Sequence, residues 1–245
     1  MQLADVVLLS GESASQRAMD VVANNIANMN TTGFKRESVA FASHMNKAGD
    51  ISFATERGAY RDFSNGPIEK TNNQLDIAIK GEGFLEVQMP DGSTRYTRDG
   101  ALTLNNTGQL VTSGGNPILA QGGQPLTLPN TISELNISAD GQISAKTDPT
   151  SKDLALLGKI ELVKFENPQA LQATGENLYS TSQASEPATD YMIVQGALEH
   201  SNVEPIVEMT KMIEVSRTYE RTSNLIGDDN TRNTDALDKL SKTTA

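Results

Sequence analysis

The sequence predicts an α+β protein, in which long N- and C-terminal helices pair as a coiled-coil-like stalk around an inserted antiparallel β-rich domain. The two terminal segments carry apolar residues at helical spacing and contain a single proline, Pro205. The other eight of the nine prolines fall between Pro67 and Pro187, and twelve of the nineteen glycines fall between Gly81 and Gly175. This middle composition is typical of turns that join short strands.

The C-terminal segment, residues 201–240, has the clearest pattern. Its residues follow alternating steps of three and four that include Met209, Met212, Tyr219 and Ile226, which is a heptad rhythm. At 1.5 Å per residue such a helix is a rod roughly 50–60 Å long. A rod of this length cannot be buried within its own small domain, so we expect an element outside it to cover the apolar stripe.

The N-terminal segment, residues 3–29, is a second amphipathic stretch without proline. Ala14, Val21 and Asn25 lie on one line of it, and the small residues there permit close approach of another helix. The segment ends before Gly33, which suits the left-handed conformation that closes many helices. Two long amphipathic segments therefore enclose the rest of the chain, which predicts an antiparallel pair with the middle as one insertion.

The middle of the chain contains many short segments of strand-like character separated by glycine turns such as Asp91-Gly92 and Asp140-Gly141. These turns favour a meander or a small barrel. The region 34–73 has no clear pattern and is predicted to be a partly extended connector, and 167–187 is predicted to be loop or extended chain. The expected strands are residues 75–80, 84–89, 94–98, 101–104, 109–112, 117–120, 126–128, 135–138, 142–145 and 156–165.

These patterns divide the chain into four consecutive parts. We expect an N-terminal helix at residues 1–34, an extended connector at 35–74, a β-rich outer domain at 75–190, and a return segment with the C-terminal helix at 191–245.

The composition excludes several classes of protein. The formal net charge is −11 and there is no basic patch, which argues against a nucleic-acid partner because phosphate binding needs Lys and Arg. The chain has no cysteine, so a disulfide, a zinc–thiolate site and a cysteine nucleophile are impossible. The apolar runs are too short to insert in a membrane, and the N-terminus lacks the basic start of an ordinary cleaved signal peptide.

Residues with catalytic potential are few and scattered. The two histidines, His44 and His200, belong to no spacing with a serine and an acid. The glycine pair in residues 81–83 reads as a turn between strands, and the acidic run 228–235 lacks the glycine and the terminal glutamate of a calcium loop. We therefore expect no enzyme activity, no cofactor and no metal.

Several runs of residues resemble the signatures of bacterial flagellar rod and hook proteins. The run VANNIANMNTTGFKR at residues 22–36 is similar to the motif that closes the first helix of that family. LDIAIKGEGF at 75–84 and YTRDG at 96–100 resemble its central motifs, and GALEHSNV at 196–203 with EMTKMI at 208–213 resembles its C-terminal signature. The chain matches least from about 122 to 185, as expected of a variable outer domain.

The resemblance implies a structural role in the basal body of the flagellum. Proteins of this family pack their terminal helices against each other and against those of neighbouring subunits, forming a hollow drive shaft with the β-rich domains outside. The run RGAYRDFSNGPI at residues 57–68 is most similar to proximal-rod proteins, with a distal-rod or hook subunit as the alternative. The implied partners are copies of the chain, other rod proteins and the flagellar type III export apparatus, which would carry the chain to the periplasm-spanning rod without a cleaved signal peptide.

We expect the assembly contacts to lie on the apolar lines of the two terminal helices. The alternative is that the same residues are buried within one subunit, since a residue in a heptad seam can pack against a helix of its own subunit or of a neighbouring subunit. The asparagines Asn24, Asn25, Asn28 and Asn30 either specify the register of the pair, since a buried amide must find its partner in one alignment, or cap the helix and are exposed to solvent. The expected contacts are Val21, Asn25, Ile26, Met29, Met209, Met212, Ile213, Tyr219 and Ile226.

A different class of function also fits the predicted architecture. A secreted β-rich carbohydrate-binding module or enzyme could use the two helices as a dimerisation stalk. Such a site needs convergent acids or aromatic side chains, and only 4% of the residues are aromatic. The composition therefore favours the structural role.

Overall fold

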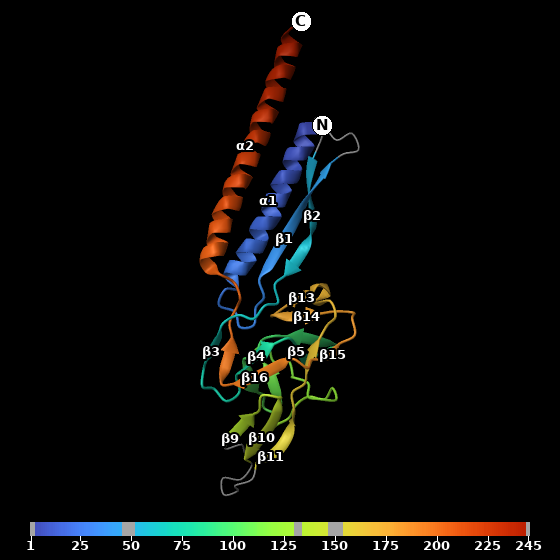
Figure 1. The fold of residues 1–245 in the computed structure, drawn as a ribbon. Helices are drawn as coiled ribbons and strands as arrows, with labels where there is room; N and C mark the ends of the chain where they lie inside the picture. Colours follow the sequence, from blue (N-terminus) through green and yellow to red (C-terminus); the bar gives the residue numbers. More distant parts are fainter. Residues whose placement is uncertain (1–2, 46–51, 130–133, 147–153, 244–245) are drawn as a thin grey trace. The chain divides into compact units, whose positions relative to one another are not determined.

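The computed structural model describes residues 3–45, 52–129, 134–146 and 154–243, and within them the fold is α+β with antiparallel strands (Figure 1). The chain forms two compact units. We call residues 1–28, 36–62 and 203–245 the helical unit, and residues 29–35 and 63–202 the β-rich unit. The predicted fold class is thereby confirmed in its coarse form, and the coiled-coil character of the helix pair stays a prediction.

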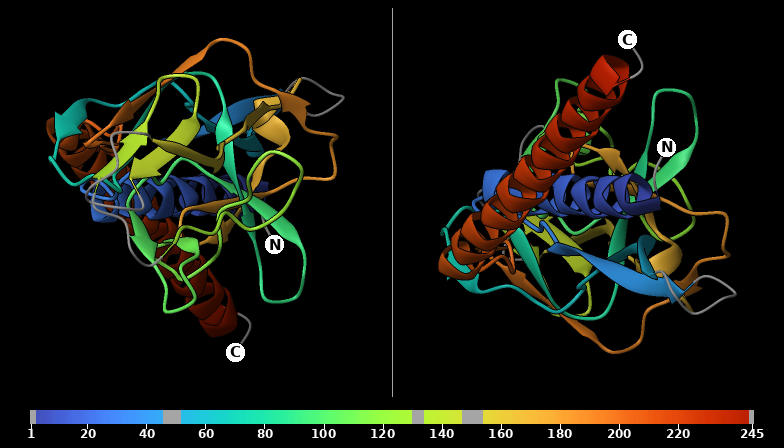
Figure 2. Two further views of the ribbon diagram at one scale, coloured as in Figure 1. Left: turned by 90° about the horizontal axis from the view of Figure 1, so that it is seen from below. Right: turned by 90° about the horizontal axis from the view of Figure 1, so that it is seen from above.

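The helical unit contains two helices and one β-hairpin. The helices run in opposite directions alongside each other, and the hairpin packs on α1 (Figures 1 and 2). Seen from above in Figure 2, the two helix axes are inclined to each other. The hairpin has a bulge between Ala40 and Phe41. The elements are α1 (Leu3–Ala27), β1 (Glu37–Met45), β2 (Ser52–Arg61) and α2 (Pro205–Thr243).

The start of α2 has a local cause in the sequence. Pro205 is the first residue of α2, where its missing N–H removes no helical hydrogen bond. The helix begins four residues later than expected, because the chain before it pairs elsewhere: the N–H of Asn202 donates to the carbonyl of Phe34 at 3.4 Å. α1 ends at Ala27, six residues before the predicted stop at Gly33; Gly33 has the predicted left-handed conformation, with φ of +67°, but its N–H donates to the carbonyl of Glu199 and not to the helix.

The β-rich unit is built from small antiparallel sheets. The largest has six strands in the order β13-β14-β6-β5-β12-β15, and β11-β10-β9 form a three-stranded sheet. The remaining pairs in this unit are β16-β4, β17-β3 and β7-β8. The elements are β3 (Ile68–Lys70), β4 (Ile77–Gly81), β5 (Phe84–Gln88), β6 (Thr94–Thr97), β7 (Leu102–Leu104), β8 (Leu110–Thr112), β9 (Glu134–Ile137), β10 (Gln142–Lys146), β11 (Ala155–Lys159), β12 (Leu162–Lys164), η1 (Pro168–Ala170), β13 (Gln172–Gly175), β14 (Leu178–Ser180), β15 (Glu186–Pro187), β16 (Tyr191–Gln195) and β17 (Ala197–Glu199).

The predicted meander holds only in part. Sequential hairpins join β5 to β6, β7 to β8 and β9 through β11. By contrast, β4 pairs with β16 and β3 pairs with β17, so strands from the two ends of the unit lie side by side. The expected strands at 117–120 and 126–128 form isolated bridges instead of longer ladders. The predicted connector contains β1, β2 and β3, and the predicted loop at 167–187 contains η1 and three short strands.

Two apolar clusters hold the β-rich unit together. The larger cluster contains fully buried residues from many strands, including Leu85, Ile143 and Leu162. The smaller cluster is aromatic, and in it Phe84 and Tyr179 pack edge to face with ring centroids 5.9 Å apart. Because short strands bury few residues each, the unit depends on these shared clusters for its stability.

Candidate functional site

One buried amide connects the elements of the helical unit. The Nδ2 of Asn25 donates to the backbone carbonyl of Glu37 at 2.8 Å and to Oε2 of Glu208 at 3.1 Å. Its Oδ1 accepts the backbone N–H of Glu37 at 2.9 Å. Asn25 therefore ties α1 both to the start of β1 and to α2, and a buried amide with this set of partners is satisfied in a single alignment.

The partner carboxylate of Asn25 is itself buried. Glu208 lies in the first turn of α2, where the N-terminal end of the helix dipole favours a negative charge. Its second oxygen, Oε1, lies 2.8 Å from Nζ of Lys211. The heptad pattern predicts Met209 at this level of the seam and not Glu208, because an apolar pattern gives no signal for a buried acid.

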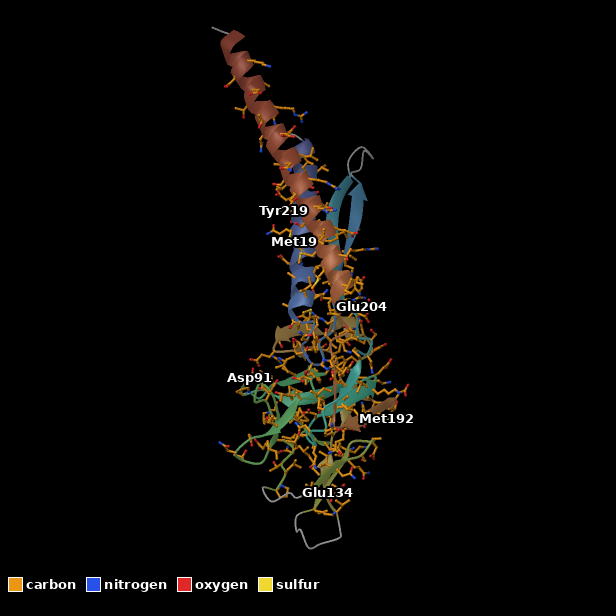
Figure 3. The ribbon with its side chains drawn as sticks, turned by 90° about the vertical axis from the view of Figure 1, so that its left-hand side faces the viewer. Met19, Asp91, Glu134, Met192, Glu204 and Tyr219 are labelled. Carbon is orange, nitrogen blue, oxygen red and sulfur yellow. The ribbon has the colours of Figure 1, made fainter. Side chains whose placement is uncertain are left out.

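The side of α2 that packs on α1 follows a heptad line shifted from the predicted one. Glu208 is bonded to α1, and Thr222 lies close to Gly11 of α1. Figure 3 shows Tyr219 of α2 and Met19 of α1 where the two helices run alongside each other. Steps of four and three from Glu208 place the following less exposed residues on this side: Met212, Val215, Tyr219, Thr222, Ile226 and Asp229. Three predicted contacts, Met212, Tyr219 and Ile226, thus lie within the subunit's own helix pair.

The other two predicted contacts of α2 are on its solvent-exposed side. Met209 is 48% exposed and Ile213 is 53% exposed, and Ile206 in the same stripe is 80% exposed. These residues follow one another at steps of three and four, so they share one side of the helix. An apolar stripe of this size on a helix that already uses another side is a candidate surface for a further helix.

The predicted contacts of the N-terminal segment do not form one surface. Val21 and Asn25 are buried, and Ile26 is half-buried. Met29 follows the end of α1 in a turn and belongs to the β-rich unit. Asn28 donates to the backbone and the side chain of Asn24 one turn earlier, which is a local role.

The residues with catalytic potential have separate places in the described part of the chain. His200 lies 2.9 Å from Glu69 on the surface, and the side chain of His44 lies outside the described residues. Residues 81–83 form the predicted turn between β4 and β5, and the acidic run 228–235 is part of α2. Among the described residues, no group of three or more metal-ligating side chains comes together.

Within the described residues, neither α1 nor α2 has a stretch that is long and apolar enough to cross a membrane.

Comparison with known families gives three matches along the chain. Residues 7–35 match the model described as flagella basal body rod protein. Residues 78–145 match the D1 domain of the flagellar hook protein FlgE/F/G, and residues 194–237 match the C-terminal region of the flagellar basal body rod FlgEFG proteins. The first and last of these matches cover most of α1 and α2.

Curated relatives extend the similarity over nearly the whole chain. The flagellar basal-body rod protein FlgF of Caulobacter vibrioides is 37% identical over 243 residues, which is 96% of each chain. The rod protein FlgG of Buchnera aphidicola is 36% identical over 89% of this chain and 92% of its own. FlgF of Mesorhizobium japonicum is 32% identical over 92% of both chains.

Proposed function

Because the chain belongs to the family of flagellar basal-body rod and hook proteins, we propose that it is a structural subunit of the proximal rod and has no catalytic activity. The observation that carries the proposal is the match to FlgF of Caulobacter vibrioides across 96% of both chains, terminal helices included. The matches to FlgG proteins keep a distal-rod subunit as the alternative.

The terminal helices are the proposed assembly elements. In this proposal α1 and α2 form a coiled-coil-like stalk, and helices of neighbouring subunits cover the stripe of Ile206, Met209 and Ile213. Each large apolar side chain contributes about 1.5–3 kcal/mol when it is fully buried. These three side chains are about half to four-fifths exposed in the single chain, so their burial favours association by several kcal/mol per subunit.

The partners in this proposal are copies of the chain and other rod proteins. The subunits form a segment of the hollow shaft that transmits torque from the motor to the hook. The β-rich unit lies on the outside of the shaft. The flagellar type III apparatus exports the chain to the periplasm-spanning rod without cleavage of a signal peptide.

A deletion strain tests the proposed function. We expect cells without this chain to be non-motile and to carry rods cut short when their basal bodies are examined by electron microscopy. A rod that stops early indicates the proximal position, and a rod that lacks only its far end indicates the distal one. Normal swimming of the deletion strain would overturn the proposal.

A further inference from the structure

Three charged side chains are buried together in the β-rich unit, at 0% exposure for Lys35, 3% for Arg98 and 1% for Glu199. Nζ of Lys35 lies 2.6 Å from Oε1 of Glu199, and an Arg98 guanidinium nitrogen lies 3.5 Å from Oε2. We call these residues the buried triad. Removing charges from water costs several kcal/mol per ion. The triad therefore needs an explanation beyond filling the interior.

The triad forms hydrogen bonds with backbone groups as well as between its own side chains. Lys35 donates to the carbonyl of Ser64 at 2.7 Å, and Oε1 of Glu199 accepts the N–H of Gly66 at 2.9 Å. The backbone carbonyl of Glu199 accepts the N–H of Gly33 at 2.7 Å. One residue, Glu199, thus holds three stretches of chain that are far apart in the sequence.

These three stretches each adjoin a point at which the chain continues from one unit into the other. The chain passes between the two units after residues 28, 35, 62 and 202. Three of the stretches that the triad connects, 29–35, 63–66 and 199–202, are the parts of the β-rich unit next to these passages, and Arg98 adds a hydrogen bond to the carbonyl of Gly81 at 3.0 Å farther inside the unit. All of the triad's contacts described here lie inside the β-rich unit.

We infer that Glu199 is a positioning residue that holds together the segments through which the chain continues from the β-rich unit to the terminal helices. We call Glu199 and the contacts it makes with these segments the latch. An apolar side chain could fill the same space, but it would not fix which backbone groups meet. The charged groups fix them, since the hydrogen bonds of Lys35 to the carbonyl of Ser64 and of the Gly66 N–H to Glu199 form in one alignment.

The charges of the triad give the latch a testable asymmetry. Lys35 and Arg98 supply two positive charges against one negative charge on Glu199. Burial lowers the pKa of Arg98, and the carboxylate of Glu199 opposes this change. Replacing Lys35 by Met leaves a pair of opposite charges, Arg98 and Glu199, whereas replacing Glu199 by Gln removes the carboxylate that pairs with both buried cations. If only packing mattered, the two nearly isosteric changes would have similar effects.

The latch has a mechanical role that rests on the proposed function. A rod subunit carries load between its helices and its β-rich unit, and that load passes through residues 29–35, 63–66 and 199–202. Loosening them lets the joint yield without unfolding the rest of the unit, where the apolar clusters are untouched.

Amide hydrogen exchange of the full chain tests the latch directly. In Lys35→Met we expect exchange in residues 63–66 and 199–202 to speed up about tenfold, with strands of the main core unchanged. In Glu199→Gln we expect at least a hundredfold increase there. The control is Lys146→Met, which removes an ion pair with Glu134 on the surface of the same unit and should change neither stretch.

The outcome separates a latch from a general contribution to stability. Equal effects of the two triad variants, or equal acceleration throughout the β-rich unit in Lys35→Met, would overturn the inference. If Glu199→Gln fails to fold, the distribution of faster exchange in Lys35→Met alone tests the inference, because Lys35→Met keeps the opposite charges of Arg98 and Glu199.

Complementation of the deletion strain tests the mechanical role. We expect Lys35→Met to restore rods of normal length, with a swimming speed that falls below wild type as the medium is made more viscous. If the wild-type chain does not restore motility, the proposed function fails. If it does, and Lys35→Met swims equally well at every viscosity, the mechanical role of the latch is refuted.

Discussion

Gly33 gives the sharpest prediction for the β-rich unit, because its site combines a left-handed backbone with a close neighbour. A Cβ added there would lie 2.5 Å from the backbone carbon and oxygen of Arg98 and 2.8 Å from the nitrogen of Asp99. None of these atoms belongs to a flexible side chain. Replacing Gly33 by Ala must therefore move one stretch of backbone away from another.

Two contributions determine the expected loss of stability. Placing a residue with a Cβ in the left-handed region costs about 1–2 kcal/mol. Moving the chain also strains or breaks the hydrogen bond from the N–H of Gly33 to Glu199, which contributes about 1 kcal/mol, in addition to the lost packing. We expect Gly33→Ala to destabilise the β-rich unit by about 3–4 kcal/mol.

Gly92→Ala is the matched control. Gly92 has φ of +82°, and a Cβ there meets nothing within 4 Å, so this variant shows the conformational cost alone, about 1–2 kcal/mol. Urea unfolding followed by tyrosine fluorescence reports on this unit through the buried Tyr96 and Tyr179. The reasoning is refuted if Gly33→Ala is no more destabilising than Gly92→Ala.

Three further predictions concern other buried groups. Asn25→Asp places a second carboxylate beside Glu208, so we expect this variant to assemble less into basal bodies at neutral pH. Asn25→Gln keeps the amide, and we expect a smaller loss of assembly. Equal assembly of the two variants would contradict the role of charge. Burial, and to a smaller extent the charge of Glu161, raises the pKa of Glu86 above 4.5, so ionisation of Glu86 lowers the stability of the folded protein as the pH rises. We therefore expect the melting temperature of Glu86→Gln to increase relative to that of wild type from pH 4 to pH 7. A difference in melting temperature that does not change with pH would contradict this. Leu85→Ala removes a fully buried side chain from the main core and should cost about 3–5 kcal/mol in urea unfolding, and a loss below 1 kcal/mol would show that the site is loosely packed.

The sequence predicted the elements that depend on local pattern. The apolar spacing around Met212, Tyr219 and Ile226 located α2, whereas the first helix ends at Ala27, six residues before the predicted stop at Gly33. Turn dipeptides separated most of the central strands correctly. In each case the signal lies within a few residues of the element it describes.

The pairing between distant strands could not be predicted in the same way. β4 meets β16 more than a hundred residues later, and no local pattern specifies that partner. The β1–β2 hairpin was missed because residues 46–51 between the strands gave no recognised two-residue turn, and its strands carry weak alternation.

The side of α2 that faces α1 could be predicted only in part for a similar reason. A heptad line identifies the apolar residues of a helix, but it does not say which of them meet the helix of the same subunit. Glu208 takes the place expected for Met209 on the side facing α1, because Asn25 and Lys211 satisfy its carboxylate. The motifs around Lys35, Arg98 and Glu199 were recognised in the sequence, but their convergence depends on the tertiary fold.

Cysteine cross-linking in isolated basal bodies tests the central claim most directly, because the natural chain contains no cysteine. Ile213→Cys places a single thiol in the exposed stripe of α2, and Asp91→Cys places one on the exposed turn after β5 as a control. We expect bifunctional thiol–amine reagents of short reach to link Ile213→Cys to other rod subunits, with far less linkage from Asp91→Cys, as identified by mass spectrometry. Absence of the chain from washed basal bodies, or equal linkage from the two positions, would contradict the account.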